Sequence, residues 1–206
     1  MPRCSNCKEE GHTRARCQNP TVVAPPRVLE EVPLVDIQLP EDVRAKFGRI
    51  VQMCEEVAYG LGKGHVEAHY QQALCVELQM AGIQHVTEEV MPITYKGRSI
   101  GGGCNWRLDI VLLSFLPFII ELKAIPGKLG NTQHWQLVRY MTYKDVPYGA
   151  VINFSQSDKG QLEFHFIVRH SGSHWLYEIT SQKGIALSDF TMTSSLSEIH
   201  NSDNDE

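Results

Sequence analysis

Two consecutive apolar runs, 106–113 and 118–124, contain charged residues that a buried strand does not tolerate unpaired. The first run holds Asp109. The second ends with Glu121 and Lys123, which lie two residues apart and therefore on one face of a strand. Only a short segment separates the runs, so they predict an antiparallel pair of strands in which Asp109 and Glu121 are neighbours. One divalent cation bound by both carboxylates would offset the cost of burying them, and this layout is typical of sites that cleave phosphodiester bonds.

The segments around these runs alternate between helical and strand patterns. Apolar residues spaced three and four apart predict helices at about 41–60, 66–81 and 132–143. The second helix is expected to bury Val66, Tyr70, Ala73, Leu74 and Leu78. Shorter apolar runs predict strands at 86–95, with a turn at 96–98, and at 148–154, 162–168 and 175–179. The pattern favours an α+β (α/β) fold.

Composition divides the chain into four parts. Residues 1–20 contain a cluster of cysteine and histidine residues, and residues 21–40 form a Pro-rich linker because proline restricts the backbone to extended conformations. Residues 41–170 hold the predicted helices and most of the strands. Residues 171–206 are expected to form one short strand followed by an acidic, disordered tail.

The first part has the ligand spacing of a tetrahedral zinc site, Cys4-x-x-Cys7-x4-His12-x4-Cys17. A segment this short cannot bury a core, so zinc would supply most of its folding free energy, about 10 kcal/mol or more. The segment resembles the CCHC zinc knuckle family at every ligand position. That resemblance implies binding to single-stranded nucleic acid.

The knuckle departs from many members of that family, because it lacks the aromatic and apolar residues that form a platform for an unstacked base. We therefore expect its basic residues to contact phosphates with little sequence preference. These residues are Arg3, Lys8, Arg14 and Arg16. The alternative is a zinc-stabilised tag that binds proteins or is purely structural.

Charge and cysteine usage limit the classes of protein that this chain can belong to. A net charge of -5 argues against a wholly basic nucleic-acid binder, although basic residues outnumber acids in 1–20 and 185–206 contains acids only. Cys54, Cys75 and Cys104 lie far apart in apolar surroundings, which indicates a reducing, intracellular compartment, cytoplasm or nucleus. No secretory start is evident, and no apolar run is long enough to span a membrane.

Gly64, Glu67 and Tyr70 spell the motif of the GxxExxY family, which belongs to the PD-(D/E)XK nuclease superfamily, and the chain resembles this family over about 41–170. The matching stretches are 64–74, 107–109, 121–124, 136–140 and 149–154. Gln136-x-x-x-Tyr140 also resembles the helical motif of RecB-like nucleases. The resemblance implies a restriction-endonuclease-like core with a mixed central sheet flanked by helices, here preceded by a small zinc knuckle.

Each site residue has a hypothetical role. We expect Asp109 and Glu121 to bind Mg²⁺ or Mn²⁺, with a backbone carbonyl and waters completing the shell, while Glu67 binds the cation directly or through water. Lys123 would orient the attacking water or balance negative charge. Gln136 and Tyr140 are the last two candidate site residues. They would hold the lysine or a phosphate, unless they are a capping pair on a partly buried helix. One metal or two stays open.

Other polar and aromatic residues are given ordinary roles. His65 and His69 lie four residues apart on a helix without a nearby cysteine, so surface or core positions are favoured over metal ligation. Arg107 is expected to pair with an acid, Trp106 to lie in the core, and Glu88-Glu89 to face solvent.

Two classes of function remain. The first is a metal-dependent nuclease that cleaves DNA or RNA and is tethered to a nucleic-acid-binding knuckle by the linker. The second is a non-catalytic nucleic-acid-binding or assembly protein that keeps a nuclease-like scaffold, since fold alone does not assign chemistry. A weaker alternative makes the knuckle and tail protein-docking elements only. The sequence leaves the mode of cleavage, the oligomeric state and the protein partners open.

Overall fold

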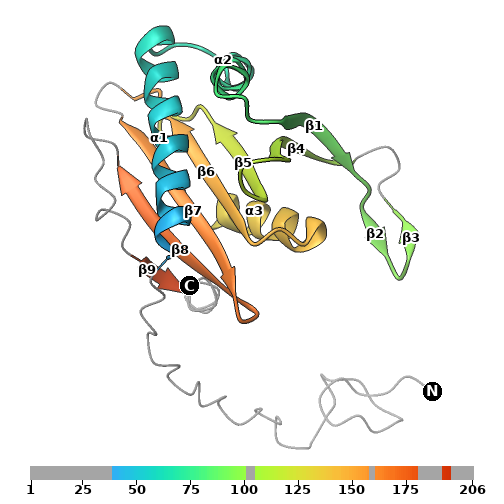
Figure 1. Ribbon diagram of the computed structural model, residues 1–206. Coiled ribbons are helices and arrows are strands. Elements are labelled where there is room, and N and C mark those ends of the chain that lie inside the picture. The colour runs from blue at the N-terminus through green and yellow to red at the C-terminus, as the bar shows by residue number, and fades with distance from the viewer. Residues whose placement is uncertain (1–38, 101–104, 158–160, 181–191, 196–206) are drawn as a thin grey trace, which may run out of the picture. The chain divides into compact units, whose positions relative to one another are not determined.

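The computed structural model describes residues 39–100, 105–157, 161–180 and 192–195 (Figure 1). All described residues belong to one compact unit of the chain, Ile37–Glu206. The predicted zinc knuckle and nearly all of the Pro-rich linker lie outside the described residues.

Within the described residues, three α-helices form where the apolar spacing predicts them: α1 (Glu41–Leu61), α2 (Glu67–Met80) and α3 (Asn131–Lys144). In α1 the apolar residues recur every three or four positions and are buried along one side of the helix. They are Val43, Phe47, Ile50, Val51, Met53, Cys54 and Val57. None of the helices in the described part of the chain is long and apolar enough to cross a membrane.

The prediction that Val66 is buried is wrong. Val66 precedes α2 in an extended conformation, so it does not share the helical stripe, and it is 62% exposed. The buried residues of α2 are Tyr70, Leu74 and Leu78, which are spaced four apart, with Ala73 packed partly against them.

A seven-stranded sheet with the order β1-β4-β5-β6-β7-β8-β9 forms the centre of this unit. Its strands are β1 (His85–Met91), β4 (Trp106–Leu112), β5 (Phe118–Lys123), β6 (Tyr148–Phe154), β7 (Leu162–His170), β8 (Ser173–Thr180) and β9 (Met192–Ser195). Among the described strands only β5 and β6 pair in parallel, and α3 provides the crossover that a parallel pair requires. The expected mixed sheet with flanking helices is confirmed.

Helices cover both faces of the sheet, as Figure 1 shows. Phe118, Ile120 and Leu122 of β5 lie in a core cluster with α1 and α2, whereas Ile119 lies in a second cluster with α3. A strand buried on both faces reads as a continuous apolar run, which explains the sequence before Glu121. By the same alternation, Glu121 faces α3.

The C-terminal part of the sheet differs from the prediction. The sequence indicates one short strand after residue 170 and an acidic, unstructured remainder. The short strand is present as β8, which pairs with β7 from Ser173 to Thr180, but β9 adds a further strand at 192–195. The rest of the predicted tail, 181–191 and 196–206, lies outside the described residues. The sequence of β9, Met-Thr-Ser-Ser, is short and mostly polar, so it carries no period-2 apolar signal. Its strand conformation depends on pairing with β8, which is a tertiary interaction.

A separate two-stranded sheet joins β1 to β4. It consists of β2 (Thr94–Tyr95) and β3 (Arg98–Ser99), which form the predicted hairpin. Lys96 and Gly97 at its turn both have positive φ, 48° and 74°, as the tight turns of two-residue hairpins require.

Candidate active site

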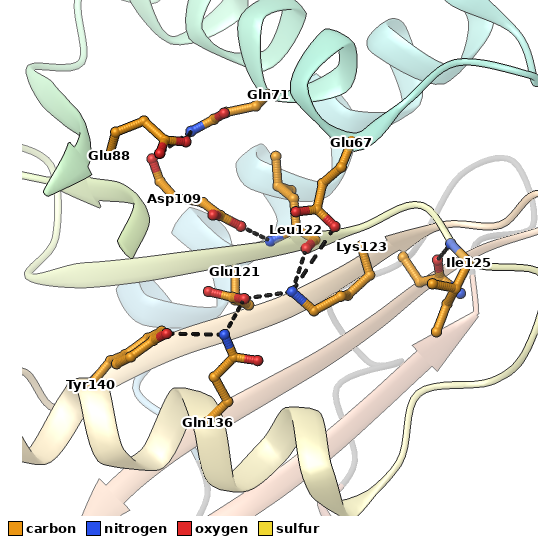
Figure 2. A network of polar contacts seen from close by, with 11 residues as sticks. Glu67, Gln71, Glu88, Asp109, Glu121, Leu122, Lys123, Ile125, Gln136 and Tyr140 are labelled. Carbon is orange, nitrogen blue, oxygen red and sulfur yellow. Dashed lines mark hydrogen bonds and ion pairs between the residues drawn. The ribbon is translucent and has the colours of Figure 1, made fainter. Parts of the chain in front are cut away.

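The two acids of the apolar runs lie on adjacent antiparallel strands. Ile110 of β4 and Ile120 of β5 form the last pair of this ladder, and Asp109 and Glu121 each lie one residue beyond it on their strands. The Asp109 carboxylate accepts a hydrogen bond from the backbone N–H of Leu122 at 2.7 Å (Figure 2). This bond fixes one carboxylate oxygen of β4 against the backbone of β5.

The ammonium group of Lys123 lies between acids from two different elements. Its Nζ donates to Oε1 of Glu121 at 2.5 Å and to the carbonyl oxygen of Leu122 at 2.9 Å, and it lies 4.0 Å from Oε2 of Glu67 on α2. Figure 2 shows the side chains of Glu67, Asp109 and Glu121 converging on this region. The structure therefore brings the three predicted acids and the lysine together.

Gln136 on α3 orients Glu121. Its Nε2 donates to Oε1 of Glu121 at 2.7 Å and to the hydroxyl oxygen of Tyr140 at 3.0 Å. The helix cap is formed elsewhere, because the side chain of Gln133 accepts from the backbone N–H of Gly130. Gln136 and Tyr140 thus hold an acid of the site, where the sequence led us to expect the lysine, a phosphate or a helix cap.

Burial dominates the electrostatics of the acids. Glu121 is 2% exposed, and burial together with the charge of Asp109 raises its pKa to about 7, although Lys123 lowers it. Burial also raises the pKa of Glu67 and of Asp109. Burial alone would lower the pKa of Lys123, but Glu121, Glu67 and Asp109 favour the ammonium and raise this pKa overall. The site carries an excess of negative charge in a partly dehydrated setting.

The donor set fits a hard divalent cation. Oε2 of Glu121 is buried and has no hydrogen-bond partner within the described ranges, which is costly for a carboxylate oxygen. No group of three or more His, Cys, Asp or Glu side chains among the described residues is arranged to hold a metal. Mg²⁺ does not require such a cage, because it usually binds one or two carboxylates and keeps several waters. Asp109, Glu121 and the Leu122 carbonyl supply ligands of that kind.

Two residues of the Gly64-x-x-Glu67-x-x-Tyr70 motif have structural contacts. Gly64 has φ 90°, a conformation that favours glycine, and its N–H donates to the side chain of Gln156 at 2.8 Å. The Tyr70 hydroxyl donates to the carbonyl of Gly62 at 2.8 Å and accepts from Gln156 at 3.1 Å. The glycine and the tyrosine fasten the α1–α2 connection to the segment after β6, and the motif's acid is left to face the site.

Gln71 and Glu88 contact the site, and the sequence analysis missed them. Gln71 Nε2 donates to the carbonyl oxygen of Asp109 at 2.8 Å and to Glu88 at 3.0 Å. Glu88 also pairs with Arg107 at 2.6 Å, which confirms the expected pairing of this arginine. Glu88 has φ 54° and interrupts the ladder between β1 and β4 beside Asp109. The alternation of apolar and polar residues around Glu88 does not indicate this interruption of the ladder. The prediction that Glu88 simply faces solvent is therefore incomplete.

The remaining candidates divide into described and undescribed residues. His65 and His69 contact each other at 3.3 Å between their Nδ1 atoms and belong to no metal-binding group of the described residues. The zinc ligands and the basic residues of the knuckle lie outside the described residues and stay predictions. They are Cys4, Cys7, His12, Cys17, Arg3, Lys8, Arg14 and Arg16.

Comparison with known proteins places these residues in a family context. The family model described as PD-(D/E)XK nuclease superfamily matches residues 45–165, more than half of the chain. The matched segment contains every site residue from Glu67 to Tyr140. No curated protein and no solved structure matches the chain significantly.

Proposed function

Because the chain belongs to the PD-(D/E)XK nuclease superfamily, we propose that it hydrolyses phosphodiester bonds of DNA or RNA with the help of Mg²⁺ or Mn²⁺. The observation that carries this proposal is the buried carboxylate of Glu121, which lies beside Asp109 with one oxygen unpartnered. A protein that used this fold only as a scaffold would have no reason to retain such a costly group. The Gly64, Glu67 and Tyr70 motif supports assignment to the GxxExxY family within the superfamily.

Asp109, Glu121 and the Leu122 carbonyl are the proposed ligands, and Glu67 joins them directly or through water. When bound, the cation supplies Lewis-acid stabilisation of the phosphoryl charge and lowers the pKa of a water molecule. Gln136 keeps the Glu121 carboxylate in one orientation through its hydrogen bond to Oε1. This bond leaves Oε2 available as a ligand.

Lys123 has two roles in the proposed mechanism. Its positive charge lowers the pKa of Glu121 and so favours the ionised form that a cation needs. Its ammonium group also lies between Glu67 and Glu121, where it can donate a hydrogen bond to a phosphate oxygen or to the attacking water. Both roles require a charged donor on the same strand face as Glu121.

The zinc knuckle adds a binding function to this proposal. Cys4, Cys7, His12 and Cys17 would hold Zn²⁺, and the neighbouring basic residues would contact the phosphates of a single strand. Tethering through the Pro-rich linker would raise the local concentration of substrate near the nuclease site. The expected location is intracellular.

A cleavage assay tests the proposal. Labelled single- and double-stranded DNA and RNA are incubated with the purified chain, with and without Mg²⁺ or Mn²⁺. Wild type is compared with Glu121→Gln and Lys123→Ala, and the matched controls are the α1 variants Glu56→Gln and Lys46→Ala. We expect metal-dependent cleavage that is lost in the two site variants and kept in the two controls. Cleavage that persists in both site variants contradicts the proposal.

The same assay separates the non-catalytic alternative. A chain that binds these substrates but cleaves none of them with either metal is a binding or assembly protein. Zinc content and single-strand binding of Cys17→Ser test the knuckle independently, because this variant leaves the nuclease site unchanged. Full zinc content and full binding in that variant contradict the role assigned to the knuckle.

A further inference from the structure

The segment 92–100, here called the hairpin arm, lies outside the main sheet. Its strands β2 and β3 pair only with each other, and Figure 1 shows them extending past the ends of β1 and β4. A two-stranded hairpin is marginally stable by itself in water and is normally stabilised by further strands or by packing against a helix. The positive φ angles of Lys96 and Gly97 give the arm a tight, defined turn.

The side chains of the hairpin arm are exposed and cationic. Tyr95 is 61% exposed and Ile100 is 59% exposed, and neither belongs to a core cluster. The Nζ of Lys96 lies 5.4 Å from the centroid of the Tyr95 ring, and Arg98 is paired with Tyr95 across the hairpin. The arm contains no acidic residue. An exposed aromatic ring beside two cations is not explained by packing.

The hairpin arm projects from the same end of the sheet as the candidate active site. The last pair of β1 and β4 before the arm is Met91 with Trp106, and Asp109 is three residues further along β4. Four residues separate Tyr95 from Met91 and three separate Trp106 from Asp109, so at the rise and spacing of strands the Cα atoms of Tyr95 and Asp109 lie no more than about 30 Å apart. A nucleic acid bound with its scissile phosphate at the site would extend over such a distance.

Aromatic and cationic groups also occupy the space between the site and the hairpin arm. The ring of Trp106 lies 6.3 Å from that of Tyr140, which contacts Gln136. The guanidinium carbon of Arg139 lies 5.0 Å from the centroid of the Trp106 ring, and Arg139 is exposed. Tyr140 is buried, so the groups that a ligand could reach between the site and the base of the arm are the partly exposed ring of Trp106 and the guanidinium group of Arg139.

We propose that the hairpin arm binds the single-stranded part of the nucleic-acid substrate next to the bond that is cleaved, with a base on Tyr95 and phosphates on Lys96 and Arg98. This inference rests on the proposed nuclease function. Stacking on an aromatic side chain requires an unpaired base, because the bases of a duplex are stacked on one another. Positive charges alone would bind duplex and single strand alike, so the exposed ring is what selects the single strand.

Binding without cleavage tests the arm. Fluorescence anisotropy of labelled single-stranded oligo-dT and oligo-U, and of a duplex of equal length, is measured for the full chain in Ca²⁺ without Mg²⁺. Tyr95→Ala is expected to bind the single strands about tenfold more weakly than the matched control Tyr59→Ala, an exposed tyrosine of α1. Lys96→Ala/Arg98→Ala is expected to lower the salt slope by about 1.4, whereas the control Lys46→Ala/Arg49→Ala leaves it unchanged. Equal affinity in Tyr95→Ala and Tyr59→Ala, or a loss confined to the duplex, overturns the proposal.

A second measurement locates the contact even if the knuckle dominates affinity. Oligonucleotides containing 5-iodouracil are cross-linked to the wild-type chain with ultraviolet light, and the modified peptides are identified by mass spectrometry. A cross-link on the peptide that contains Tyr95 supports the inference, and its absence from that peptide overturns it. Cleavage with Mg²⁺ is measured separately, so cleavage without arm contact refutes the arm alone, and arm contact without cleavage refutes hydrolysis alone.

Discussion

Glu121→Gln is expected to stabilise the metal-free protein at alkaline pH, because the buried carboxylate of Glu121 weakens the fold. Its pKa is 4.5 in the unfolded chain and is raised to about 7 in the folded protein by burial and by Asp109. The folded state therefore holds a proton that the unfolded state has already released. The stabilising contribution is fully present below about pH 4.5 and is lost as the pH rises through about 7.

The size of the effect follows from the two pKa values. The difference between 4.5 and about 7, at 1.36 kcal/mol for each pKa unit, corresponds to about 3 kcal/mol of lost stability at alkaline pH. Glutamine has nearly the same shape and cannot ionise, so the variant lacks this loss. This gain in stability would illustrate the common trade-off between the stability of a fold and a buried charge that serves its function.

Urea denaturation in EDTA at about pH 5 and at about pH 8.5 measures the effect for wild type and Glu121→Gln. We expect the stability of the variant relative to wild type to increase by about 2.5 kcal/mol between these two pH values, because a small part of the loss has already occurred at pH 5. Comparing the two pH values removes any contribution of the substitution that does not depend on pH. Glu56→Gln, at an exposed position of α1, serves as the control and should show no such change.

A relative stability that stays constant between the two pH values would contradict this expectation. It would mean that Glu121 titrates normally in the folded protein, and the electrostatic case for a cation at this site would be lost. A relative stability that falls with pH would contradict the sign of the argument.

Three further predictions concern other parts of the fold. The buried side chains of His134 and His165 are in contact at 2.6 Å, and burial lowers the pKa of each to about 4. The free energy of unfolding should therefore fall as the pH drops from about 6.5 towards 4. In urea titrations, the double variant His134→Phe/His165→Leu should show a smaller fall over this pH range. Gly149→Ala should cost about 1–3 kcal/mol, because the added Cβ would lie 3.0 Å from Leu137 Cδ1, and an unchanged urea midpoint would contradict the packing. Gln71→Ala should lower kcat about tenfold with little change in KM, as expected for loss of a positioning hydrogen bond to the Asp109 backbone, and equal kcat would remove this role.

The part of the site that lies on the strands could be predicted from the sequence. Asp109, Glu121 and Lys123 interrupt apolar runs, and a charge within a buried strand needs a partner whatever the fold around it. Period-2 alternation then fixes which of these side chains share a face. The periodicity of the local sequence also predicts the three helices. Their apolar residues recur every three or four positions, and the helices lie close to their predicted bounds.

Residues whose position depends on tertiary pairing could not be predicted. Glu88 lies beside the site because the ladder between β1 and β4 is interrupted at this residue, opposite Asp109, and Gln71 because α2 packs next to that interruption. Strand β9 is polar and exists by pairing with β8. The partner of Gln136 was also set by packing, since helical spacing places it on a face with Tyr140 but does not say which charged group that face meets.

The measurement that tests the central claim most directly is Mg²⁺ binding by isothermal titration calorimetry to wild type, Asp109→Asn and Glu121→Gln. Mg²⁺ prefers oxygen ligands, so the thiolates of the predicted knuckle do not contribute to the signal. We expect that wild type binds Mg²⁺ and that each substitution weakens binding at least about tenfold, while Glu56→Gln binds as wild type does. Equal Mg²⁺ affinity in wild type and in both site variants would contradict the claim that these two carboxylates hold the cation.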